Sequence, residues 1–126
     1  MFINIILIIN GVYDLVCAAS ILWLHEIPFF STFSKLHPKM FIEQHSDHHV
    51  IQRLLSYWII TYGMVRIMAG FHRDNALYMV AALTYFIEAF CFEYESRVFN
   101  TMVSSKVMFV SMTSIIIGIF IIRDTY

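Results

Sequence analysis

Residues 53–94 read RLLSYWIITYGMVRIMAGF, then HRD, then NALYMVAALTYFIEAFCFEY. These are two apolar runs of about 20 residues, each long enough to cross a bilayer as a helix, separated by a polar tripeptide. Such a short link makes the two helices antiparallel neighbours. Asp74 or Asn75 is suited to cap the start of the second helix. The stretch therefore predicts a transmembrane helical hairpin with spans at about 53–71 and 75–94.

Two further apolar runs flank this hairpin, at about residues 2–24 and 107–122. They extend the prediction to four transmembrane helices with both termini on one side of the membrane. The first run lacks a basic N-terminal region and carries Asp14, so we interpret it as a retained span rather than a cleaved signal peptide. The expected fold class is an all-α integral membrane bundle, with residues 1–126 forming a single membrane domain.

The composition also favours a membrane environment. Of 126 residues, 60% are hydrophobic and 13% are charged, against roughly 25% charged in soluble domains. A soluble domain of this size would need more polar side chains to cover its surface. The net charge of -1 gives no basis for nucleic-acid binding. Membrane lipids and other integral membrane proteins are the expected partners.

The longest polar stretch, residues 25–52, is rich in histidine. Its segment HSDHH at 45–49 has the spacing of one histidine box in membrane di-iron desaturases and hydroxylases. Those enzymes take ligands from several histidine boxes. No second box is present here, so the sequence has too few ligands for a di-iron site. A single zinc ion remains chemically allowed. Its candidate ligands are His45, Asp47, His48 and His49. A solvated loop explains the same residues, and no cofactor is expected.

Three ionisable residues lie inside the predicted spans: Asp14, Arg66 and Glu88. A charge at the centre of a transmembrane helix costs about 2.5–3.5 kcal/mol on the insertion scale, so each needs a partner or a wet cavity. At about 1.5 Å per residue, Asp14 and Glu88 lie about 18 and 20 Å from the starts of the first and third spans, and Arg66 about 8 Å from the end of the second. We therefore predict that Arg66 reaches both carboxylates.

Such a charge cluster has two interpretations. It is a proton or ligand site, or it fixes which helices associate and in what register. We favour the second, because small and polar residues that suit close helix contacts stand beside the charges. The predicted helix-contact residues are Asn10, Gly11, Tyr62, Gly63 and Gly70.

No phosphate-binding loop, nucleophile elbow or Cys-x-x-Cys motif is present in the sequence. The preferred function is therefore a non-enzymatic membrane scaffold, or an accessory subunit of a larger assembly such as a respiratory-chain complex. One alternative is a small transporter or proton-conducting protein that uses Asp14 and Glu88. Further alternatives are a metal-dependent membrane enzyme that uses the histidine-rich loop and a viral membrane structural protein.

Several positions between residues 53 and 122 follow the pattern of a known family. They are Arg53, Trp58 and Arg66, the run NALY at 75–78, Glu88, and Ser111, Ser114 and Gly118 in the fourth span. In these positions the chain resembles the ergosterol-biosynthesis scaffold family, small four-span proteins that tether sterol demethylation enzymes. The NGVYD segment at 10–14 and the histidine-rich loop depart from that pattern. The resemblance implies scaffolding in the endoplasmic reticulum membrane; the mitochondrial inner membrane is the alternative compartment.

Overall fold

The computed structural model describes residues 2–22, 48–100 and 102–125, with residues 48–51 described by their backbone only. The helices are α1 (Phe2–Leu22), α3 (His48–His72), α4 (Asn75–Arg97) and α5 (Ser104–Thr125). Each is long and apolar enough to cross a membrane. The predicted fold class, an all-α bundle of four transmembrane helices, is confirmed.

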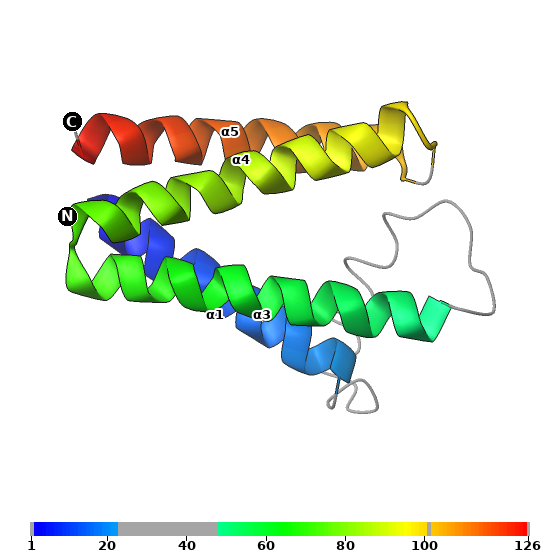
Figure 1. Cartoon of the computed structure of the whole chain (residues 1–126), viewed down its shortest axis with the longest axis horizontal. Coiled ribbons are helices and arrows are strands. Elements are labelled where there is room, and N and C mark those ends of the chain that lie inside the picture. The colour runs from blue at the N-terminus through cyan, green and yellow to red at the C-terminus, as the bar shows by residue number, and fades with distance from the viewer. Residues whose placement is uncertain (1, 23–47, 101, 126) are drawn as a thin grey trace.

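The helices run antiparallel in chain order, so both ends of the chain and the α3–α4 turn lie at the same end of the bundle (Figure 1). We call this the terminal end. α1 packs mainly on α3 and α4 mainly on α5, and the two pairs meet through α3 and α4. α1 and α5 have little direct contact. The bundle is therefore two helix pairs that leave a gap in packing between the first and last helices.

The sharp turn between α3 and α4 is built by two adjacent residues. Arg73 adopts a left-handed backbone conformation with φ of 52°, and its N–H donates to the carbonyl of Ala69, which ends α3. Asp74 then caps α4: its Oδ1 accepts from the N–H groups of Ala76 at 2.9 Å and Leu77 at 3.2 Å. Of the two predicted capping residues, Asp74 holds the position.

Replacing Asp74 with alanine should lower the free energy of unfolding by about 0.5–2 kcal/mol, the usual effect of losing an N-cap. The two backbone N–H groups at the start of α4 would lose their side-chain acceptor. Asp74→Asn should stay close to wild type, because asparagine caps as well as aspartate. Unfolding in mixed micelles measures both values. An equal loss in the two variants would contradict the capping role.

Among the described residues, the core cluster shared by all four helices lies near the terminal end. One buried cluster there combines residues of every helix: Ile3 and Leu7, Ala69, Ala81, Ala82 and Tyr85, and Ile121. Toward the other end the core divides into one cluster between α1 and α3 and another around Phe92 of α4 and Val107 of α5. Trp58 packs against both of these clusters. The two helix pairs are therefore less tightly joined away from the terminal end.

The helices extend beyond the predicted spans into polar sequence. α3 begins at His48, α4 continues to Arg97, and α5 begins at Ser104. An apolar run predicts only the part of a helix that lies in the hydrocarbon core. Polar side chains stabilise the helical turns outside that core. In the last turns of α4, Arg97 Nε donates to Glu93 Oε2 at 2.5 Å. The end of the loop predicted at 25–52 thus belongs to α3, and the rest lies outside the described residues.

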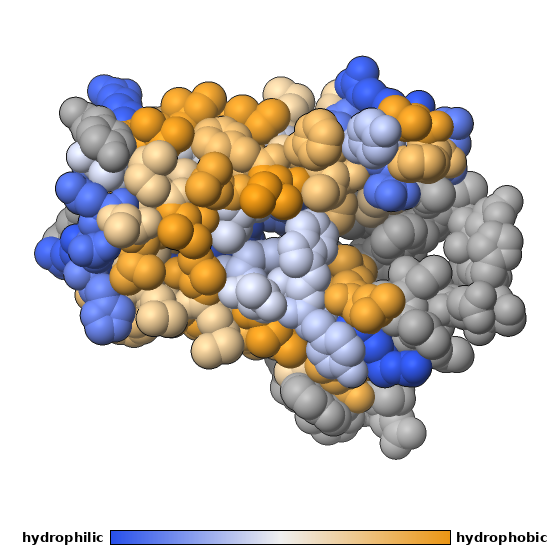
Figure 2. Space-filling view, viewed as in Figure 1, coloured by the Kyte–Doolittle hydropathy of each residue, from blue (hydrophilic) through white to orange (hydrophobic). Residues whose placement is uncertain are grey.

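Exposed side chains follow the polarity expected of a membrane bundle. Figure 2 shows hydrophobic side chains over much of the middle of the visible face and hydrophilic ones gathered at both ends of the helices. The exposed hydrophobic residues form stripes at helical spacing. Among them are Ile5, Ile9 and Val12 on α1, Met64, Met68 and Phe71 on α3, Leu83, Ile87 and Phe90 on α4, and Met112, Ile116 and Ile119 on α5. All four helices therefore present apolar surface to lipid or to other membrane helices.

The topology predicts that Phe2→Cys and Thr125→Cys react from the same face of the membrane. The native Cys17 and Cys91 would first be replaced by alanine to remove background labelling. A membrane-impermeant maleimide applied to sealed vesicles of known orientation should label both sites or neither. Labelling of the two sites from opposite faces would exclude four spans.

Candidate functional site

Glycines bring α1 and α3 into close contact. A Cβ at Gly11 would lie 2.6 Å from the backbone oxygen of Gly63, and a Cβ at Gly63 would lie 3.0 Å from the Cβ of Asp14. Nearer the terminal end, a Cβ at Gly70 would lie 2.9 Å from the backbone oxygen of Asn4. The three glycines predicted for helix contact thus all lie in this interface, which places Asp14 directly against α3.

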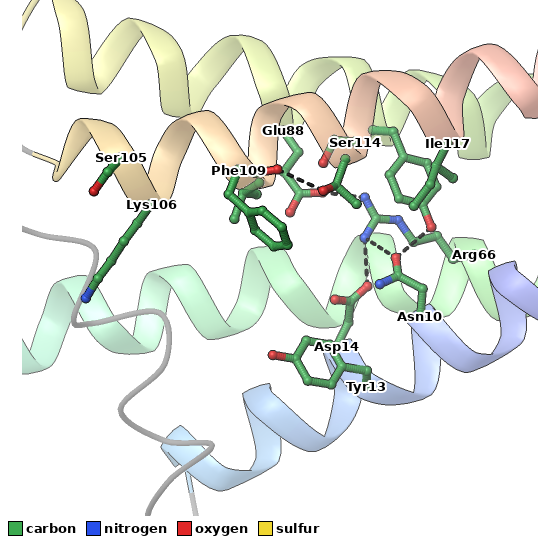
Figure 3. A pocket seen from close by; sticks show the side chains of 13 residues that line it. Asn10, Tyr13, Asp14, Arg66, Glu88, Ser105, Lys106, Phe109, Ser114 and Ile117 are labelled. Carbon is green, nitrogen blue, oxygen red and sulfur yellow. Dashed lines mark hydrogen bonds and ion pairs between the residues drawn. The ribbon is translucent and has the colours of Figure 1, made fainter.

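Arg66 lies at the centre of a buried polar network and is only 1% exposed. Its Nη1 donates to Asp14 Oδ2 at 2.8 Å and to Asn10 Oδ1 at 3.1 Å. Its Nη2 donates to Glu88 Oε2 at 2.6 Å, and its Nε to Thr84 Oγ1 at 3.2 Å. The structure therefore places the three predicted intramembrane charges in direct contact, and Arg66 links α1 to α4 (Figure 3).

Two tyrosine rings enclose the guanidinium. The carbon Cζ of Arg66 lies 3.6 Å from the centroid of the Tyr85 ring and 4.3 Å from that of Tyr62. Both are within the range of cation–π attraction. Tyr85 also donates its hydroxyl to Asn10 Oδ1 at 2.6 Å, whereas the buried Tyr62 hydroxyl has no hydrogen-bond partner among the described residues. Ring stacking thus adds to the ionic contacts that hold Arg66 in place.

We call Asp14, Arg66 and Glu88 the charge cluster. Each has at most 7% of its surface exposed, so bulk water gives these groups little solvation. In lipid, a buried charge is tolerable when a counter-charge and hydrogen bonds replace its hydration. The cluster contains one positive and two negative groups, which gives it a net charge of -1 when both carboxyls are ionised.

Sequence reasoning missed two members of the network, Thr84 and Tyr85. They precede Glu88 by four and three positions, so they share its face of α4. It also missed the hydrogen bond that Tyr78 donates to Asn4, which joins α4 to α1 nearer the terminal end. Their helical spacing from Glu88 could have predicted that Thr84 and Tyr85 belong to the network.

A pocket of about 510 Å³ adjoins the charge cluster in the gap between α1 and α5. Asp14, Arg66 and Glu88 line its inner end, and residues of α5 from Ser105 to Ile117 form one wall. Figure 3 shows Ser114 and Ile117 beside the Arg66 side chain and Lys106 far from it, toward the start of α5. The buried charges therefore face a cavity as well as one another.

The side chains of all four zinc-ligand candidates lie outside what the structure describes. His45 and Asp47 lie outside the described residues, and His48 and His49 are described only as the backbone of the first turn of α3. Among the described residues, no three histidine, cysteine or acidic side chains are grouped to hold a metal ion.

We predict that purified protein carries no transition metal in stoichiometric amount, since the histidine segment offers too few ligands for a di-iron centre. Elemental analysis of the detergent-solubilised chain measures this directly. One or more iron or zinc ions per chain, lost in a His48→Ala variant, would overturn the prediction.

The chain matches a known protein family. A family model described as Erg28 like protein matches residues 6–121. No curated protein and no solved structure matches the chain. The family match confirms the resemblance noted in the second half of the sequence. It also includes the first span and the histidine-rich loop, the two regions that sequence reasoning regarded as departures.

Members of this family are membrane scaffold or accessory proteins of sterol synthesis. The four helices that can cross a membrane and the family match together make this chain an integral membrane protein of the scaffold type. Because the matched region covers most of the sequence and the greater part of all four helices, the chain belongs to the Erg28-like protein family.

Proposed function

We propose that this protein holds membrane-bound enzymes of sterol demethylation together in the endoplasmic reticulum membrane. The observation that carries the proposal is the family match over residues 6–121. The chain supplies no chemistry of its own in this function. It acts by binding other integral membrane proteins through its helices.

The distribution of polar and apolar groups supports this proposal. Arg66 directs its hydrogen bonds inward, to residues of α1 and α4. The exposed stripes on all four helices are apolar. A bundle held together by an internal network keeps its outer faces for lipid and for the helices of partners. An internal polar network combined with apolar outer faces is suited to a scaffold.

Purification from native membranes in mild detergent tests the proposal. The tagged chain should bring down sterol-demethylating membrane enzymes in near-stoichiometric amounts, identified by mass spectrometry. An unrelated four-span protein with the same tag is the control. Depletion of the chain should also raise the level of methylated sterol intermediates. A chain that purifies alone, together with an unchanged sterol profile after depletion, would contradict the proposal.

A proton-conducting protein is the second candidate, because a cavity reaches Asp14 and Glu88 deep in the bundle. Proteoliposomes with an internal pH dye distinguish the two functions. The informative variant combines Asp14→Asn, Arg66→Leu and Glu88→Gln. A folded variant that loses partner binding would place the charge cluster at an interface. Retained binding with loss of a proton flux present in wild type would favour conduction.

A further inference from the structure

The pocket between α1 and α5 is elongated and opens toward the lipid-facing surface. Its lining on α5 extends from Ser105 to Ile117, which spans about 18 Å of helix. Tyr13 of α1 and Phe109 of α5 also line it, and they are 41% and 74% exposed. Because α1 and α5 have little direct contact, the described residues leave a path between them by which a lipid could reach the pocket.

The inner end of the pocket carries hydrogen-bonding atoms without partners among the described residues. Arg66 binds one oxygen of each carboxylate, Oδ2 of Asp14 and Oε2 of Glu88, which leaves Oδ1 and Oε1 as acceptors. Ser114 also lines the pocket, is 5% exposed, and its hydroxyl makes no hydrogen bond within the described part of the chain. These atoms belong to residues that line the pocket, so a molecule bound there can donate a hydrogen bond to the carboxylate oxygens.

The charges that line the pocket limit which kind of hydrogen-bond donor can bind there. With both carboxyls ionised, the charge cluster carries a net charge of -1, which disfavours fatty acids, phospholipid phosphates and other anions. Lys106 lines the opposite end of the same pocket, and its positive charge disfavours a cationic amphiphile there. A neutral hydroxyl group satisfies the carboxylate oxygens without adding a charge. The volume of about 510 Å³ falls within the usual range of small-molecule pockets, about 300–1,000 Å³.

We infer that this pocket binds a lipid alcohol, an uncharged amphiphile whose polar end is a hydroxyl group. The hydroxyl donates a hydrogen bond to Asp14 or Glu88 and accepts one from Ser114. The apolar body lies along Phe109 and Val110. Sterols and diacylglycerols share this chemistry, and the two are separated by experiment. This lipid site is additional to the proposed scaffold function and does not depend on it.

Photolabelling of the purified full-length chain tests the inference without any partner protein. Two probes are used separately: a photoactivatable sterol with a free hydroxyl and a photoactivatable diacylglycerol. At least one should label peptides of α1 and α5 that line the pocket, and whichever labels identifies the source of the alcohol. An excess of the same lipid should compete, whereas its O-methyl ether should compete at least tenfold less well.

Two variants and one control localise the labelling. Thr113→Trp fills the pocket from an exposed position and should reduce pocket labelling at least fivefold. Met112→Trp places the same ring on the adjacent exposed position, which does not line the pocket, and should leave labelling unchanged. Ser114→Ala removes one hydrogen bond and should weaken competition by about two- to tenfold.

Three results would overturn the inference. The first is that neither lipid labels the pocket. The second is equal competition by the alcohol and its methyl ether. The third is equal labelling of the Thr113→Trp and Met112→Trp variants. If Thr113→Trp does not fold, Ser114→Ala with the methyl ether comparison decides the question alone.

Discussion

Replacing Arg66 with leucine should lower the free energy of unfolding by about 3–5 kcal/mol, the usual range for breaking a buried ion pair. The substitution would leave Asp14 and Glu88 in the bundle without their shared counter-charge. It would also remove hydrogen bonds to Asn10 and Thr84. Unfolding by steric trapping or in mixed micelles measures the change. Arg53→Leu, at an exposed position of the same helix, is the matched control and should change stability by less than about 0.5 kcal/mol.

Removing all three charges together should cost less than removing Arg66 alone. Asp14→Asn, Arg66→Leu and Glu88→Gln combined leave no uncompensated charge in the bundle, whereas the single variant leaves two acids. Such non-additivity is expected of residues in one coupled network. If the three single changes add to the loss seen in the triple variant, the cluster is not energetically coupled.

Replacing Gly11 with alanine should destabilise the protein by about 1–3 kcal/mol, a typical cost of overpacking. The new Cβ would lie 2.6 Å from the backbone oxygen of Gly63 and 3.1 Å from the backbone nitrogen of Ile67. Backbone atoms cannot turn aside, so α1 and α3 must separate. Asp14 is one turn further along α1, and the separation would also weaken its contact with Arg66.

Gly118→Ala provides the matched comparison in the α4–α5 interface. Its Cβ would lie 2.8 Å from Cζ and 2.9 Å from Cε1 of the Phe86 ring, and a side-chain ring can move where backbone cannot. Alanine also favours the helix by about 1 kcal/mol over glycine. We expect a net change within about 1 kcal/mol of zero. If Gly118→Ala costs as much as Gly11→Ala, close backbone approach is not the reason for the glycine at position 11.

The sequence by itself determined the number of spans and the need for a charge cluster. Span number follows from apolar length, because a helix needs about 20 apolar residues to cross the hydrocarbon core. The grouping of Asp14, Arg66 and Glu88 follows from the cost of isolated charges in lipid. Local turn chemistry narrowed the cap of α4 to Asp74 or Asn75, and the structure places Asp74 there. Each of these depends on one segment, or on a strong energetic penalty, and can be inferred without knowing how the helices pack.

Only the tertiary structure decided which helices touch and which stand apart. The sequence marks glycines in α1 and α3 but does not say that Gly11 faces Gly63, since that depends on the rotation of both helices. No sequence pattern predicted that Thr84 and Tyr85 lie beside Arg66 or that Ser114 lines a pocket. The pocket exists because α1 and α5 do not close on each other. Hydropathy measures how well a segment dissolves in lipid, whereas helix pairing in lipid depends on shape complementarity between segments far apart in the chain.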